Sequence, residues 1–193
     1  MHFQAIEDAI YARRGYKSPT ARWTTNLMLL VVLVVVMAIA MFGYVPVSGS
    51  SMLPTINEQG DSVIIFRYAT VERGDIVVID NSDLKLHPTD KLLIKRVIAI
   101  GGDTISYKAD YSYGTQGKIV LKVNGVEIPE PYIKKTLYQS DVDNRIKRVE
   151  TGITVPDGCV YVMGDNRLTS HDSRNFGAIS IDRLVGEAVL ILR

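Results

Sequence analysis

Between Trp23 and Asn57 the chain carries no charged residue, and this run limits the possible folds more than any other feature. Its stretch from Leu27 to Val45 is almost wholly apolar and lacks the polar face of a helix that packs on a globular core. About 20 apolar residues, at about 1.5 Å each, cross the hydrocarbon core of a bilayer. The run therefore predicts one transmembrane helix, which we place at residues 26–47.

The charges on either side of this run predict its orientation in a membrane. Four basic residues precede it, namely Arg13, Arg14, Lys17 and Arg22. No charged residue follows it before Glu58. Because basic residues favour the cytoplasmic side, we expect residues 1–25 in the cytoplasm and residues 48–193 outside it. The pattern Ala38-Ile39-Ala40 also fits a signal-peptide cleavage site. The apolar run continues beyond it, however, which favours an uncleaved signal-anchor.

The chain after the apolar run has the pattern of a β domain. Six short runs rich in β-branched residues are bounded by glycine, proline, asparagine or aspartate. They lie at 62–68, 75–80, 92–100, 118–123, 159–164 and 186–192. Between 118–123 and the following Val-Glu-Ile, Asn124-Gly125 predicts a type I′ hairpin. We expect a mainly β fold: an antiparallel, barrel-like β domain with one N-terminal transmembrane helix. Residues 104–158 are expected to form a variable hairpin or ribbon insertion.

The composition excludes several classes of function. The net charge of +1 comes without a basic stripe or aromatic–basic interleaving, so nucleic acid is not expected as a partner. The single cysteine, Cys159, cannot form an intrachain disulfide or, by itself, a structural zinc site. We interpret it as a small buried residue at the start of a strand. No metal or cofactor is indicated.

Three serines follow the apolar run within residues 47–55, and a nucleophilic serine would need a base. Of the three histidines, His2 precedes the predicted helix and His87 lies in a polar loop before a proline. His171 is adjacent to Asp172. A Ser-His-Asp triad through His171 stays open, because triads are assembled in space and not along the sequence.

A lysine is the other candidate base. In the run 92–100, alternation places Lys95 on one face with Leu93 and Val97, and Arg96 on the opposite face. Both faces are apolar, so at least one of the two charges is expected near the core. Burial favours the neutral amine of lysine and lowers its pKa toward the range of a general base. The residue types alone leave open an edge-strand lysine whose head group reaches water.

Residues 163–177 form a third informative segment, between two predicted strands. Four potential ions among asparagine, serine and glycine cannot be a packed core, and they are Asp165, Arg167, Asp172 and Arg174. We expect a loop held by its own salt bridges and hydrogen bonds. Such a loop either covers a surface or supports a site.

These segments, in their order and behind a membrane anchor, resemble the type I signal peptidases, which are membrane-bound serine proteases with a serine–lysine dyad. The similarity lies in residues 48–55, 73–79, 92–103 and 163–177. Residues 104–158 agree in general character only. The resemblance implies an enzyme of the bacterial inner or plasma membrane whose catalytic domain faces the extracytoplasmic, periplasmic side. Its implied partners are the signal peptides of exported preproteins and the lipid bilayer.

The resemblance also implies roles for single residues. Ser51, directly before Met-Leu-Pro-Thr, matches the nucleophile, and Lys95 matches the general base. Ser170 matches the serine that bonds to the lysine amine. Asp172 and Arg174 match a carboxylate and a guanidinium that brace the site.

One position departs from part of the family. Gly49 stands where some members carry a serine whose hydroxyl helps to hold the oxyanion. The backbone N–H of Ser51 is therefore the expected donor, and a role for the Ser48 or Ser50 hydroxyl stays open. The resemblance further places Met52 and Leu53 near the membrane surface.

The sequence leaves two alternatives to a general signal peptidase. One is a dedicated processing peptidase for a single substrate, such as a pilin of a conjugation or secretion system. The other is a membrane-anchored β module without catalysis.

Overall fold

The computed structural model describes residues 6, 9, 13, 19–58, 60–83, 86, 91–113, 115, 117–135, 137 and 152–193. His2, His87 and most of residues 1–18 and 136–151 lie outside the described residues. By their internal contacts the residues divide into two compact units, 1–42 and 43–193.

The first unit contains helix α2 (Pro19–Met41), of which Ala21–Met41 is long and apolar enough to cross a membrane. The helix begins before the expected boundary at residue 26, and residues 42–46 form strand β1 instead of its last turn. Gly43 and Pro46 disfavour a helix here. Val45 is moreover buried in the core of the β domain. An apolar helix and an apolar strand that follow each other cannot be separated by hydropathy.

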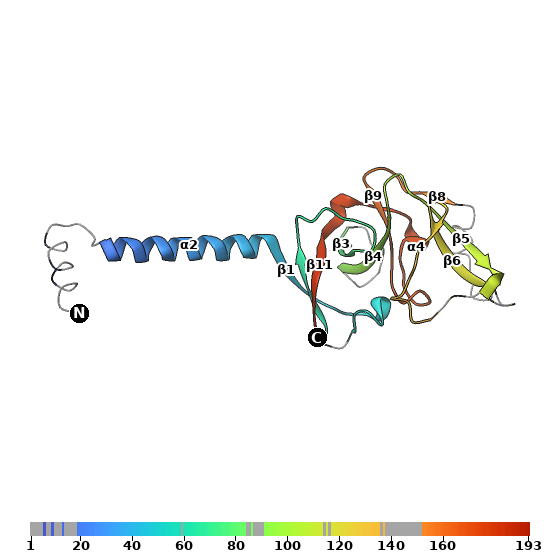
Figure 1. Ribbon diagram of the computed structural model, residues 1–193, viewed down its shortest axis with the longest axis horizontal. Coiled ribbons are helices and arrows are strands. Elements are labelled where there is room, and N and C mark those ends of the chain that lie inside the picture. The colour runs from blue at the N-terminus through green and yellow to red at the C-terminus, as the bar shows by residue number, and fades with distance from the viewer. Residues whose placement is uncertain are drawn as a thin grey trace. The chain divides into compact units, whose positions relative to one another are not determined.

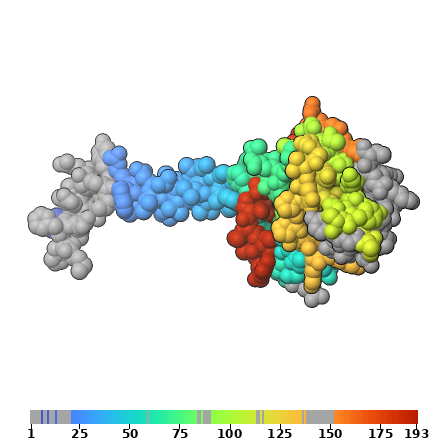
Figure 2. Space-filling model, turned by 45° about the vertical axis from the view of Figure 1, so that its right-hand side comes forward, coloured from blue at the N-terminus to red at the C-terminus, as the bar shows by residue number. Residues whose placement is uncertain are grey.

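The second unit is built on a curled, mostly antiparallel sheet of seven strands (Figure 1). Their order across the sheet is β1-β2-β11-β3-β4-β9-β10. The strands are β1 (Phe42–Pro46), β2 (Ser62–Phe66), β3 (Ile76–Asp80), β4 (Leu92–Ile100), β9 (Cys159–Met163), β10 (Ile179–Ser180) and β11 (Leu184–Leu192). Part of β11, coloured red, lies on the face shown in Figure 2. The mainly β, antiparallel fold predicted from the sequence is confirmed.

A second sheet has the order β7-β6-β5-β8 and forms a ribbon beside the first. Its strands are β5 (Thr104–Asp110), β6 (Lys118–Val123), β7 (Val126–Glu127) and β8 (Ile153–Thr154). Asn124 and Gly125 have φ angles of 53° and 80°, as a type I′ turn requires, and β6 pairs with β7 across them. Figure 1 shows the β5–β6 hairpin reaching away from the curled sheet.

Strand β4 is the centre of the hydrophobic packing. Leu93 and Val97 belong to one core cluster, Ile94 to a second and Ile98 to a third. Because both faces of β4 pack against core clusters, nearly every position of this strand is apolar. Strand β4 lies between β3 and β9, so the alternative of an edge-strand lysine reaching water is wrong.

Candidate active site

The side chains of Ser51 and Lys95 meet. Lys95 Nζ lies 2.7 Å from Ser51 Oγ, within hydrogen-bond distance. Lys95 is in the middle of β4 with only 3% of its surface exposed, and Ser51 is half-buried in the short 3₁₀ helix η1 (Ser50–Met52). Burial disfavours the charged ammonium form of lysine, and a neutral amine can accept the serine proton.

The residues on either side of Ser51 fix its position: the backbone conformation at Gly49 favours glycine, and the side chain of Met52 is buried in the core. Gly49 has φ +90°, a conformation that side-chain-bearing residues rarely adopt. Met52 is 1% exposed and packs in the core of the curled sheet together with Ile56. The core of the domain covers the Met52 side chain, so Met52 does not contribute to an exposed apolar face.

The loop after β9 holds the turn that carries Ser51. The Asn166 side chain donates from Nδ2 to the Ser50 carbonyl at 3.1 Å, and its backbone N–H donates to the Ser51 carbonyl at 2.9 Å. Thr55 Oγ1 donates to Asp165 Oδ2 at 2.5 Å. The sequence does not predict a role for Asn166. Its partners are backbone carbonyls, which every residue has, so no pattern of residue types marks these bonds. The only signal was its place in a polar Gly-Asp-Asn run directly after a strand.

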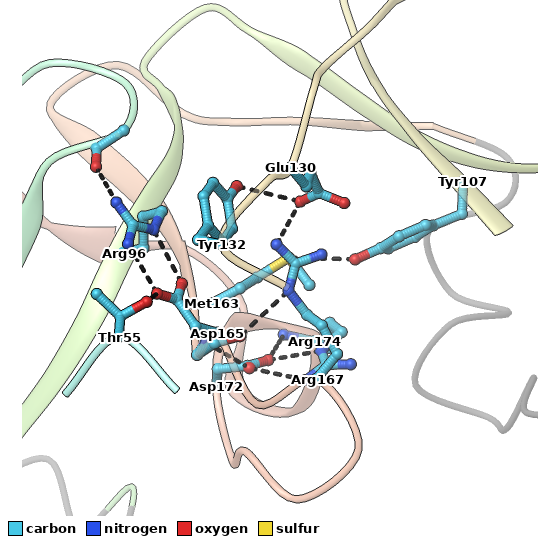
Figure 3. A network of polar contacts seen from close by, with 12 residues as sticks. Thr55, Arg96, Tyr107, Glu130, Tyr132, Met163, Asp165, Arg167, Asp172 and Arg174 are labelled. Atoms are coloured by element: carbon cyan, nitrogen blue, oxygen red, sulfur yellow. Dashed lines mark hydrogen bonds and ion pairs between the residues drawn. The ribbon is translucent and has the colours of Figure 1, made fainter. Parts of the chain in front are cut away.

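Asp165 is itself fixed by the residue next to Lys95. Arg96 makes a two-point ion pair with Asp165, with Nε–Oδ1 at 2.9 Å and Nη2–Oδ2 at 2.7 Å. Arg96 Nη1 also donates to the Gly74 carbonyl, and its guanidinium lies 4.1 Å from the centre of the Tyr132 ring. Figure 3 shows Thr55 and Arg96 converging on Asp165. Both side chains of this ion pair are almost wholly removed from water.

A second buried ion pair lies further along the same loop (Figure 3). Asp172 accepts two bonds of 2.8 Å from Arg174, and its Oδ2 also accepts from the Gly164 N–H at 3.0 Å. Asp172 is the N-cap of helix α4 (Ser173–Phe176) and forms a capping box with Asn175. Burial alone would raise the pKa of Asp172, but the bonds from Arg174 and Gly164 outweigh it and hold this pKa below its usual 3.8.

These contacts leave no place for the triad through His171. The carboxylate of Asp172 is bonded to Arg174 and Gly164, while His171 is exposed and packs near the ring of Phe176. The histidine that is adjacent in sequence to an aspartate is thus not paired with it in the described structure.

Ser170 lies close to Ser51 without the expected bond to Lys95. Its Oγ is fully buried, and among the described residues it makes no hydrogen bond of good geometry, to the Lys95 amine or elsewhere. Its hydroxyl nevertheless lies close enough to the Asp172 carboxylate to help lower the pKa of that group. A Cβ added at Gly164 would lie 2.3 Å from Ser170 Oγ and 2.4 Å from the Ser51 carbonyl oxygen. The two serines therefore approach each other closely across Gly164.

A cleft of about 290 Å³ opens onto Ser51 and Lys95. Its walls are residues 45–49 on one side and 91–95 on the other. A hollow of the same volume lies against β6, but no serine, cysteine or histidine lines it. In the described part of the chain, no group of three or more His, Cys, Asp or Glu side chains is placed to hold a metal ion.

Known proteins resemble this chain over most of its length. The family model "Signal peptidase, peptidase S26" matches residues 20–193. A signal peptidase I of Bacillus caldolyticus is 34% identical, over 81% of this chain and 82% of that protein. Signal peptidase I V of Bacillus subtilis (strain 168) is 37% identical, over 81% of this chain and 89% of that protein. A crystal structure of a signal peptidase I from Enterococcus faecalis V583 aligns with 63% of this chain and 98% of that one, at 24% identity and a TM-score of 0.44.

Replacing Gly164 by alanine is expected to destabilise the domain. The added methyl group would overlap Ser170 and the Ser51 carbonyl, and such overpacking typically costs about 1–3 kcal/mol. The free energy of unfolding of Gly164→Ala, measured by denaturant titration, tests this. Thr169→Ala, an exposed position of the same loop, is the control and should change stability by less than about 0.5 kcal/mol. Equal stability of Gly164→Ala and the parent chain would contradict the close approach.

The Asp172–Arg174 pair predicts a dependence of stability on pH. The pKa of Asp172 is lowered in the folded state, so its contribution is complete above 3.8 and is lost as the pH falls through the folded-state pKa. At neutral pH, Asp172→Asn should cost about 3–5 kcal/mol, because Arg174 keeps a buried charge without its partner. This difference from the parent chain should shrink below about pH 4. The exposed change Asp157→Asn is the control, and a difference independent of pH would contradict the assignment.

Proposed function

The chain belongs to the signal peptidase family of S26 peptidases, and on that premise we propose that it is a membrane-bound serine endopeptidase that removes signal peptides from exported preproteins with a Ser51–Lys95 dyad. The observation that carries the dyad is the 2.7 Å contact between Lys95 Nζ and Ser51 Oγ. The burial of Lys95 supports it, because a dry environment favours the neutral amine that a base requires.

In the proposed reaction Ser51 Oγ attacks the scissile carbonyl while Lys95 takes the hydroxyl proton. The resulting ammonium group gives this proton to the departing amine as the C–N bond breaks, which leaves an acyl-enzyme on Ser51. Lys95, neutral again, then takes a proton from a water that attacks the ester. Collapse of the second tetrahedral intermediate returns the proton from Lys95 to Ser51 Oγ and releases the signal peptide.

The oxyanion is held by backbone N–H groups near Ser51. Gly49 has no side chain to contribute a hydroxyl, so the Ser51 N–H is the principal donor. Ser170, Asp172 and Arg174 are the proposed supporting residues. The ion pair of the last two fixes the loop on which Ser170 stands beside the nucleophile.

The substrate lies in the cleft between residues 45–49 and 91–95. An extended peptide that enters between two backbone segments can pair with them as an added strand. The family preference for small residues at the first and third positions before the cut calls for apolar contacts, which Val45, Val47 and Leu93 of this cleft can supply.

We further propose that α2 spans the bacterial plasma membrane once, with residues 1–25 in the cytoplasm and the β domain outside. The basic residues before the helix support this orientation, and the length and apolar character of α2 support the span. Ser51 follows Met41, the last residue of α2, by ten positions. A short connection of this kind keeps the nucleophile near the membrane from which a signal peptide emerges.

Alanine substitutions test the dyad. Ser51→Ala and Lys95→Ala should each lower the cleavage of a preprotein by at least about 10³-fold, because each removes a group that the chemical step needs. His171→Ala should cleave at nearly the parental rate. Rates are measured with purified full-length protein in detergent. An inactive His171→Ala beside an active Lys95→Ala would contradict the dyad.

Labelling of spheroplasts tests the orientation. In a Cys159→Ser background, a cysteine introduced as Glu58→Cys should react with a membrane-impermeant maleimide added outside spheroplasts. A cysteine introduced as Arg13→Cys should react only after lysis. The reverse pattern would show that the domain faces the cytoplasm.

A further inference from the structure

We propose that Asn166 is a positioning residue that aims the Ser51 N–H at the oxyanion; this inference rests on the proposed function of Ser51. Asn166 holds two successive carbonyls of the nucleophile turn. Its Nδ2 donates to Ser50 O at 3.1 Å and its N–H donates to Ser51 O at 2.9 Å. The side chain of Asn166 thus contacts the peptide that links Ser50 to Ser51.

The first of these bonds acts through the geometry of one peptide unit. The Ser50 carbonyl and the Ser51 N–H belong to the same planar, trans peptide, so they point in opposite directions. A donor that fixes the direction of Ser50 O therefore also fixes the direction of the Ser51 N–H. A hydrogen bond to the carbonyl also polarises the unit and makes its N–H a stronger donor.

The Ser51 N–H is available for this purpose. The Ser50 carbonyl also accepts from the Leu53 N–H at 3.2 Å, but within the described residues no recorded backbone or side-chain bond uses the Ser51 N–H as donor. Because Gly49 carries no hydroxyl, the orientation of this single N–H has greater weight than in a site with a side-chain donor.

Asn166 is itself held on a rigid support. Its backbone carbonyl accepts from the N–H groups of Thr169 and Ser170 at 3.2 and 3.0 Å. The preceding residue, Asp165, is fixed by the buried ion pair with Arg96. The backbone of Asn166 is thus held by bonds within its own loop and by the anchored Asp165, in addition to its bond to the Ser51 carbonyl.

A residue with this role affects the transition state more than substrate binding. Loss of an oxyanion donor costs about 10²–10³-fold in kcat, and loss of its orientation should cost less, about 10–10²-fold. KM should stay within about twofold, because the cleft is lined by other residues. The pH profile should keep its shape, because Asn166 does not contact the Ser51–Lys95 bond.

The test compares full-length Asn166→Ala, Asn166→Asp and the parent chain in detergent with one preprotein substrate. A peptide aldehyde, which forms a tetrahedral adduct with the serine, probes the oxyanion site. The cleaved signal peptide probes ground-state binding. We expect the inhibition constant of the aldehyde to rise by the same factor as kcat falls, and that of the cleaved peptide to stay constant. Asn166→Asp, nearly identical in shape, places an oxygen against the Ser50 carbonyl and should be at least as impaired as Asn166→Ala.

The control is Asn81→Ala, which removes another buried asparagine that bonds to backbone, through Oδ1 to the Leu86 N–H. This variant should lose stability but keep kcat and aldehyde affinity. The inference is overturned if both Asn166 variants keep kcat within twofold. It is also overturned if the kcat of Asn166→Ala falls with a shifted pH profile, or if the kcat of either variant falls without a matching loss of aldehyde affinity. If Asn166→Ala does not fold, the isosteric Asn166→Asp decides by kcat and aldehyde affinity, because its added carboxylate can itself shift the pH profile.

Ser51→Ala, measured beside these variants, distinguishes a failure of the Asn166 proposal from a failure of the proposed function. An inactive Ser51→Ala with fully active Asn166 variants would overturn the role of Asn166 alone. An active Ser51→Ala would overturn the proposed function, and the role of Asn166 with it.

Discussion

The ion pair between Arg96 and Asp165 joins the two parts of the chain that meet at Ser51. Two neighbouring residues of β4 make the contacts. Lys95 reaches Ser51, and Arg96 binds Asp165, whose neighbour Asn166 holds the turn that carries Ser51. A shift of β4 by one residue would break both contacts together. Replacing a buried ion pair by apolar residues is often neutral in stability, whereas removing one partner is costly. This pair therefore matters mainly because it fixes the register of the site.

Much of the fold follows from the sequence, because its signals are local. The runs at 62–68 and 92–100 alternate or stay apolar as strands of a covered sheet do, and Asn124-Gly125 marks its hairpin turn. Strand β1 could not be separated from the apolar helix before it, and the two-residue strands β8 and β10 are too short to form a pattern. Whether Lys95 is at an edge or in the centre depends on strand order, which no local signal contains. The family motifs identified Ser51 and Lys95 as a pair before their contact was seen.

Two glycines shape the site for different physical reasons. Gly49 is required by its backbone, because φ +90° is strained for any residue with a Cβ although open space surrounds it. Gly164 has no such angle, but a Cβ there would overlap Ser170 and the Ser51 carbonyl. The first allows the chain to turn into the nucleophile helix, and the second allows the loop to come close to it. A sequence shows both only as glycine, so their roles become distinct once the neighbours are known.

The loop 163–177 shows how a polar segment is made rigid without an apolar core of its own. Asp172 closes helix α4 and binds Arg174, while Asp165 binds Arg96, so one ion pair fixes each end of the segment that carries Asn166 and Ser170. The Ser170 hydroxyl is fully buried, and a buried hydroxyl without a well-formed hydrogen bond is unfavourable by about 1–3 kcal/mol. A loop held only by weak surface contacts would rotate such a group toward water. The two ion pairs keep this hydroxyl inside the domain, close to Ser51.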